Sequence, residues 1–157
     1  MKKMILLIDA YNYKPSLLDF AAYLATQANA RLVGVFAESH VYEPAPALKT
    51  LGGTPYVEEI TEDANERRTH EDTVLNNIDL FTRACLQRGI TASVHRDRTA
   101  PLRTLITESR YADLLIVDPS TSFDGEHAIL TRFTSSLLHE AECPVIVAPE
   151  HYVQPHE

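Results

Sequence analysis

The feature that most constrains the fold is a regular alternation of short apolar runs with helical segments along the chain. The apolar runs cover residues 4–8, 31–37, 90–97, 112–117 and 145–149. Between them, residue patterns predict helices over 14–30, over 61–88, from 101 onward and over 125–142. Strands that alternate with helices in this way form a parallel sheet covered by helices on both faces. The sequence therefore predicts a doubly wound α/β fold.

Residues at the helix ends and along the helix faces give more local predictions. Ser16 is expected to cap the first helix and Thr99 the third, while Gly89 is placed to end the second. The buried stripe of the second helix is expected at Leu75, Ile78, Phe81 or Thr82, and Cys85. The inward residues of the last helix are expected to be Ile129, Phe133, Leu137 and Ala141. These positions set how each helix is rotated against the sheet.

The chain of 157 residues has the length of one domain, and we assign residues 1–150 to it, followed by a loose tail over 151–157. The segment 38–60 interrupts the alternation and reads as an irregular insertion rich in proline and glycine. Long loops of this kind are either lids and binding elements or disordered surface insertions. Both interpretations stay open at this point.

Charge and residue spacing exclude several functional classes. A formal net charge of −8 disfavours nucleic acid as a partner, because phosphate backbones attract basic surfaces. The first apolar run stops at Asp9, too short for a signal peptide, and no segment is long enough to cross a membrane. Neither the two cysteines nor the seven histidines have metal-ligand spacing. We therefore expect a cytoplasmic protein with no membrane partner, no nucleic-acid partner and no metal site.

Four segments carry a family resemblance when they are taken in order. They read ILLIDAYN, ANARLVGVFA, ADLLIV and LLHEAECPVIVAP. In sequence and spacing they resemble the universal stress protein (UspA-like) family over nearly the whole chain. The resemblance implies a five-stranded parallel sheet of strand order 3-2-1-4-5, the fold class of adenine nucleotide alpha hydrolase-like proteins, and a role in stress response.

The family divides into members that bind ATP and members that do not. The binders carry Gly-x-x-Gly, nine residues, then Gly and Ser or Thr, directly after the fourth strand. An ungapped count places these four positions on Asp118, Thr121, Thr131 and Arg132. Threonine disfavours the positive φ that glycine allows. A carboxylate 4 Å from a phosphate charge costs about 1 kcal/mol in water and about 4 kcal/mol near a protein surface. The sequence thus predicts that this loop does not cradle ATP in the usual family manner.

Two more positions complete an altered or vestigial nucleotide site. Asp9 matches the acidic residue that, in ATP-binding relatives, helps to hold the nucleotide at the end of the first strand. It equally suits a polar strand end that caps nearby amides. Ala37 matches the position whose backbone meets the adenine, and a backbone contact does not depend on the side chain.

Our leading hypothesis is a non-enzymatic stress-response protein that needs no cofactor and acts through association. The resemblance suggests a homodimer, and partner proteins remain unnamed. The last strand, with Val145, Ile146 and Val147, is an apolar sheet edge that invites pairing with its own copy. Its alternative is an ordinary edge covered by the tail. No catalytic constellation is apparent in the sequence.

Two alternatives remain open. The first is an adenine-nucleotide or small-molecule binder, taking ATP or AMP with Mg²⁺ at the rim of the sheet and under the 38–60 segment. Tyr42, Tyr56 or Phe123 would then stack on a planar ligand. The second is an enzyme that uses Asp9 and Asp118 as paired carboxylates, which requires the two groups to lie within a few ångströms of each other.

Overall fold

The computed structural model describes residues 2–38, 48–51, 54–57, 64–124 and 129–154. Its main sheet has five strands in the order β5-β2-β1-β6-β9, and every pairing in it is parallel. The strands are β1 (Lys2–Asp9), β2 (Ala30–Ala37), β5 (Ala92–Asp97), β6 (Leu114–Val117) and β9 (Val145–Val147). Counted along the chain within this sheet, the order is 3-2-1-4-5, which confirms the predicted fold class.

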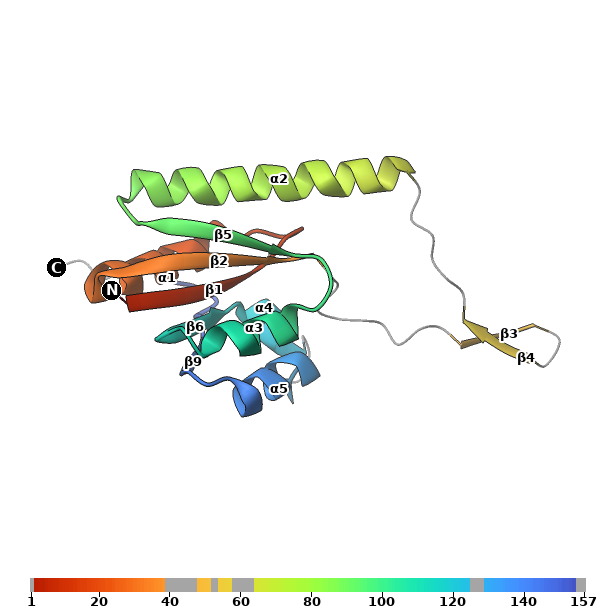
Figure 1. The fold of residues 1–157 in the computed structure, drawn as a ribbon. Helices are drawn as coiled ribbons and strands as arrows, with labels where there is room; N and C mark the ends of the chain where they lie inside the picture. The colour runs from red at the N-terminus through yellow and green to blue at the C-terminus, as the bar shows by residue number, and fades with distance from the viewer. Residues whose placement is uncertain (1, 39–47, 52–53, 58–63, 125–128, 155–157) are drawn as a thin grey trace.

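Helices cover both faces of this sheet, as Figure 1 shows. Helices α1 (Pro15–Ala28) and α2 (Ala64–Gln87) pack on one face, and α3 (Pro101–Ser109) and α5 (Arg132–Glu140) on the other. Side chains alternate along β1, so that Leu6 packs under α1 and α2, whereas Leu7 packs under α3 and α5. Both faces of the central strands are therefore buried, which explains their continuous apolar runs.

Two short strands form in the chain segment that connects β2 to α2. Strands β3 (Leu48–Leu51) and β4 (Thr54–Val57) form an antiparallel hairpin of their own, separate from the main sheet. The prediction of an irregular 38–60 segment was therefore wrong for these residues. Tyr42 and most of the segment that was considered as a possible lid lie outside the described residues.

The last helix is shorter than predicted. After β6 the chain forms α4 (Pro119–Ser122), β7 (Phe123–Asp124) and β8 (Ile129–Leu130), and only then α5. Ile129 pairs with Asp124 in a small antiparallel ladder, so its assignment to the helix was wrong. The helix begins where the hydroxyl of Thr131 accepts a hydrogen bond from the Thr134 amide, which is an N-cap.

Two predicted caps also differ in the structure. Lys14 is the N-cap residue of α1 and Pro15 its first residue, so Ser16 lies inside the helix. At the start of α3 the capping group is the Asp97 carboxylate and not the Thr99 hydroxyl. The carboxylate accepts hydrogen bonds from the amides of Thr99 and Ala100. Gly89 ends α2 with a φ of 67°, as predicted.

The buried face of α2 matches the prediction at Phe81 and Cys85 and differs from it at Leu75. Its buried residues are Val74, Asn77, Phe81 and Cys85, whereas Leu75 is 51% exposed. The Phe81 ring lies against Gly34 of β2, and the Asn77 amide donates to the Ala10 carbonyl at 2.9 Å. These two contacts fix the rotation of the helix.

The tail contacts the domain at one aromatic residue. The ring of Tyr152 lies 5.4 Å from that of Phe20 and 6.0 Å from that of Tyr23, both on α1. At this residue the tail therefore packs on α1, although a loose tail was predicted. Within the described part of the chain, no helix has the length and apolar character needed to cross a bilayer.

Candidate functional site: the crevice between β1 and β6

The strand order defines one place where a ligand would be expected. β1 pairs with β2 on one side and with β6 on the other, so the crossovers leave in opposite directions at this point. Doubly wound sheets bind ligands beyond the carboxyl ends of the strands at such a switch point. Here Lys14, in the loop after β1, and Asp118, directly after β6, meet in one crevice.

Asp118 and Lys14 form the centre of this crevice. The Asp118 side chain is only 3% exposed, and each of its oxygens lies 3.4 Å from the Lys14 Nζ. Its Oδ1 also accepts hydrogen bonds from the amide and hydroxyl of Ser120, both at 2.8 Å. The Lys14 Nζ donates to the Ser120 hydroxyl at 2.6 Å. The buried carboxylate is thus held by a cation and by two hydrogen bonds.

Little open space remains around these groups. The hollow beside them has a volume of about 30 Å³ and is also lined by Leu17, Pro149 and Glu150. That is room for one or two water molecules and far too little for a triphosphate. The chain's own side chains fill the crevice.

Backbone amides that would otherwise face a phosphate donate within the loop. They belong to Ser120, Thr121, Thr131 and Thr134. Their acceptors are the carboxylate and the carbonyl of Asp118, the carbonyl of Ser122 and the hydroxyl of Thr131, at 2.8–3.2 Å. Phosphate loops work by aiming such donors at the ligand. In this loop these four donors already have partners.

The two threonines at the glycine positions have structural partners of their own. The hydroxyl of Thr121, which is 4% exposed, donates to the Asp118 carbonyl at 2.9 Å. The Thr131 hydroxyl donates to the Thr121 carbonyl at 3.0 Å. Neither residue has a positive φ, because Asn29 is the only non-glycine residue with one in the described ranges. Arg132 is exposed at the start of α5.

Asp9 and Ala37 lie at the same end of the sheet with partners of their own. The Asp9 Oδ1 accepts from the Tyr11 amide at 2.9 Å, which is the strand-end cap that the sequence left as an alternative. The Ala37 carbonyl accepts from the Ala10 amide at 3.0 Å. Asp118 binds Lys14 and Ser120 instead, so these contacts do not join Asp9 and Asp118 as a carboxylate pair.

The prediction missed Lys14 and an ionic cluster at the ends of β2 and β5. The motif comparison began after β6, so it did not include Lys14; the signal that points to Lys14 is its place after β1, directly before Pro15. In the cluster, Arg96 donates to both Glu38 and Glu71, with bonds of 2.6 and 2.7 Å to Glu71. No sequence signal links these three residues, since they come from separate elements.

The Arg96 cluster predicts a pH-dependent contribution to stability. The hydrogen bond from Arg96 lowers the pKa of Glu71 below its ordinary value of 4.5. A carboxyl group whose pKa is lower in the folded protein than in the unfolded chain stabilises the fold at pH values above its unfolded-state pKa. This stabilisation is lost as the pH falls through the folded-state pKa. We expect Glu71→Gln to lower the urea midpoint at pH 7 and to lower it by less at pH 3, where more of the Glu71 carboxylate of the unmodified protein is protonated. Asp79→Asn, which breaks an exposed pair with Arg83 on the same helix, is the control and should change little at either pH. An equal loss at both pH values would contradict the ionic explanation.

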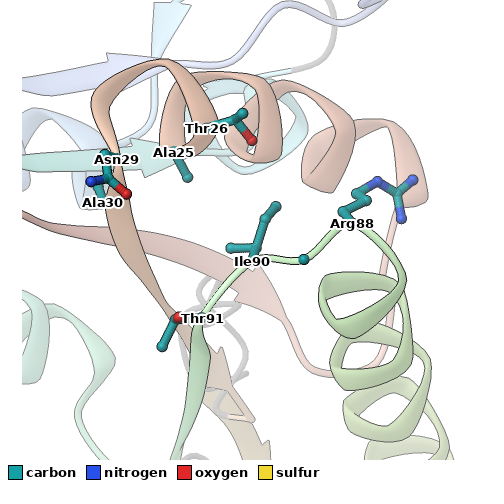
Figure 2. A pocket seen from close by; sticks show the side chains of 8 residues that line it. Ala25, Thr26, Asn29, Ala30, Arg88, Ile90 and Thr91 are labelled. Atoms are coloured by element: carbon teal, nitrogen blue, oxygen red, sulfur yellow. The ribbon is translucent and has the colours of Figure 1, made fainter.

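A larger hollow lies at the opposite end of the sheet (Figure 2). Its volume is about 340 Å³, and its walls come from the ends of α1 and α2 and the residues leading into β2 and β5. The one charged side chain among its lining residues is Arg88, which donates to Asp19 at 2.5 Å. Binding sites combine a hollow with polar groups that are free to meet a ligand, and here Thr26 and Arg88 already bond to the Ala22 carbonyl and to Asp19. We therefore place the candidate site at the smaller crevice.

Fold and crevice together define a doubly wound α/β domain whose switch-point crevice is closed by its own side chains. The family model described as "Universal stress protein family" matches residues 1–149, so the chain belongs to the universal stress protein family. No curated protein matches the sequence.

Solved structures of the family share the fold at low sequence identity. A universal stress family protein from Burkholderia pseudomallei is 18% identical with a TM-score of 0.59, over 94% of this chain and 96% of that one. UspA from Lactobacillus plantarum is 14% identical with a TM-score of 0.58, over 94% and 97%. An Arabidopsis thaliana family protein with AMP bound is 13% identical with a TM-score of 0.55, over 94% and 90%. At these identities the likeness concerns the fold alone.

Proposed function

We propose that this universal stress protein is a non-enzymatic stress-response protein of the cytoplasm that does not hold ATP in the crevice between β1 and β6. It would act through association with its own copy and with other proteins. The observation that carries this proposal is the ion pair between Lys14 and the buried Asp118 carboxylate, which occupies the place where a polyphosphate would lie.

The energetics of displacement support this proposal. A phosphate entering the crevice would take Lys14 away from Asp118 and leave a buried carboxylate facing a polyanion. Losing one hydrogen bond to a charged group costs on the order of 2 kcal/mol, which weakens binding roughly 30-fold. The repulsion between Asp118 and the phosphate charges adds to this cost.

Thermal unfolding with 5 mM ATP and Mg²⁺ tests this proposal. We expect the midpoint to stay within error of the ligand-free value, because a ligand that does not bind the folded state cannot stabilise it. The Arabidopsis thaliana protein that was solved with AMP bound serves as the positive control with AMP. A midpoint that rises with ATP concentration, or a nucleotide seen in native mass spectrometry of the purified protein, would refute the proposal.

A second candidate function is binding of an adenine nucleotide with fewer phosphates. It is favoured by the relatives that were solved with AMP, dAMP or cAMP bound. Such a ligand would rest on the rim of the sheet and leave the Lys14–Asp118 pair in place. The same thermal experiment with AMP and cAMP separates the two candidates, since only the second predicts a rise.

Association through β9 is the remaining part of the proposal. The Leu115 amide of β6 donates to the Pro144 carbonyl, and the Ala148 amide donates to the Val117 carbonyl of β6. Residues 144 and 148 therefore turn their backbone groups toward β6. Because these directions alternate along a strand, Val145 and Val147 turn theirs to the open edge. Within the described ranges, β6 is the one strand that pairs with β9. An edge with outward donors and apolar side chains favours pairing with a second copy.

A further inference from the structure

We propose that Lys14 is a latent phosphate-binding cation and that Asp118 is the residue that excludes phosphate by occupying it. The ligand class in question is a polyphosphate, free or attached to a nucleoside. This inference rests on the proposed function, in which the crevice of the unmodified protein is closed to such ligands.

The first observation that supports this proposal is the position of Lys14. Its Nζ stands at the switch point of the sheet, beyond the carboxyl ends of β1 and β6, where doubly wound proteins hold their ligands. Its side chain is 37% exposed, whereas that of Asp118 is 3% exposed. The carboxylate is therefore the fixed partner, and the ammonium group is the one that can turn toward a ligand at the mouth of the crevice.

The second observation is that the Asp118 carboxylate has two separate roles. Its carboxylate charge holds Lys14, while its Oδ1 accepts from the Ser120 amide and so shapes the turn after β6. An asparagine side chain has the same shape and keeps an oxygen acceptor, but it has no charge. Asp118→Asn thus separates the exclusion of phosphate from the geometry of the loop.

Glu150 provides a matched comparison. It lines the same crevice and carries the same charge, and no ion pair joins it to Lys14 among the described residues. If general negative charge kept phosphate out, Glu150→Gln would open the site as well as Asp118→Asn. If the hold on Lys14 is what matters, only Asp118→Asn will open it.

The experiment uses the full chain, with sodium tripolyphosphate at 5 mM as the first probe and ATP with Mg²⁺ as the second. For Asp118→Asn we expect tripolyphosphate to raise the unfolding midpoint by about 2–4 °C at low salt. The shift should vanish in 300 mM NaCl, because an exposed ionic contact is screened. The unmodified protein, Glu150→Gln and the double variant Lys14→Gln/Asp118→Asn should show no shift.

Each outcome bears on a different claim. A shift in the unmodified protein would overturn the proposed function. A flat unmodified protein together with a flat, folded Asp118→Asn would overturn only the present inference, and the function would stand. A shift that persists in the double variant would show that Lys14 is not the cation. If Asp118→Asn does not fold, Asp118→Gly, which restores the family glycine, answers the same question.

Discussion

Replacing Phe81 with alanine is expected to lower the free energy of unfolding by about 3–5 kcal/mol, a large part of the stability of an ordinary domain. The ring is fully buried. It contacts Phe36 of β2 edge-on, with ring centres 5.6 Å apart, and Tyr13 of the loop before α1 at 6.4 Å. Urea unfolding followed by circular dichroism measures the loss.

The neighbouring Leu80 is the matched control for this prediction. It belongs to the same helix but is 47% exposed, so Leu80→Ala should cost less than about 1 kcal/mol. Similar losses for the two variants would contradict the claim that the burial of Phe81 against the sheet holds α2 in place, because alanine favours the helix at both positions.

Gly34 explains why the ring fits so closely. A Cβ atom at this position would come within 2.8 Å of the Phe81 Cζ, so Gly34→Ala should cost about 1–3 kcal/mol by overpacking. In a Phe81→Leu background the same change should cost less, because the ring that causes the clash is gone. Additive losses would show that the two residues do not interact.

The main sheet was predictable because its strands are buried on both faces. A central parallel strand must be apolar at every position, so its run stands out without regard to its neighbours. The order of the strands followed from the family resemblance and agrees with the right-handed crossovers of such sheets. The apolar runs can be recognised locally in the sequence, and the strand order is shared by the whole family.

The errors arose where non-local contacts decide the structure. Ile129 continues the helical spacing of Phe133 and Leu137, and only its pairing with Asp124 removes it from the helix. Leu75 and Val74 suit a buried stripe equally well, and the Phe81–Gly34 contact selects Val74. Neither the first residue of α5 nor the rotation of α2 can therefore be predicted from residue spacing within the helix alone.

At the crevice, the sequence indicated which residues were unusual but not how they are satisfied. The changed motif positions drew attention to Asp118 and to the threonines. The partner of Asp118 is Lys14, which lies 104 residues away in the chain. Only the fold brings the two together, so the closed crevice emerged from the structure.

Replacing Ile146 with lysine is expected to convert a homodimer of this protein into monomers. Ile146 is the middle residue of the three-residue edge strand β9 and is 36% exposed. In an antiparallel pair of two such strands centred on this residue, the two copies of residue 146 lie opposite each other. Two lysines there would repel each other and lose the apolar contact, which should weaken the dimer by about 10- to 100-fold.

Size-exclusion chromatography with light scattering measures this change as a fall from twice the chain mass of 17.6 kDa to that mass. Leu75→Lys is the matched control, because it adds the same charge at an exposed leucine of α2, an element on the far side of the sheet from the β9 edge. The control should stay dimeric. A monomeric unmodified protein at high concentration would contradict association through β9, and so would an Ile146→Lys variant that keeps its dimer mass, since a charged edge strand should not pair with its own copy.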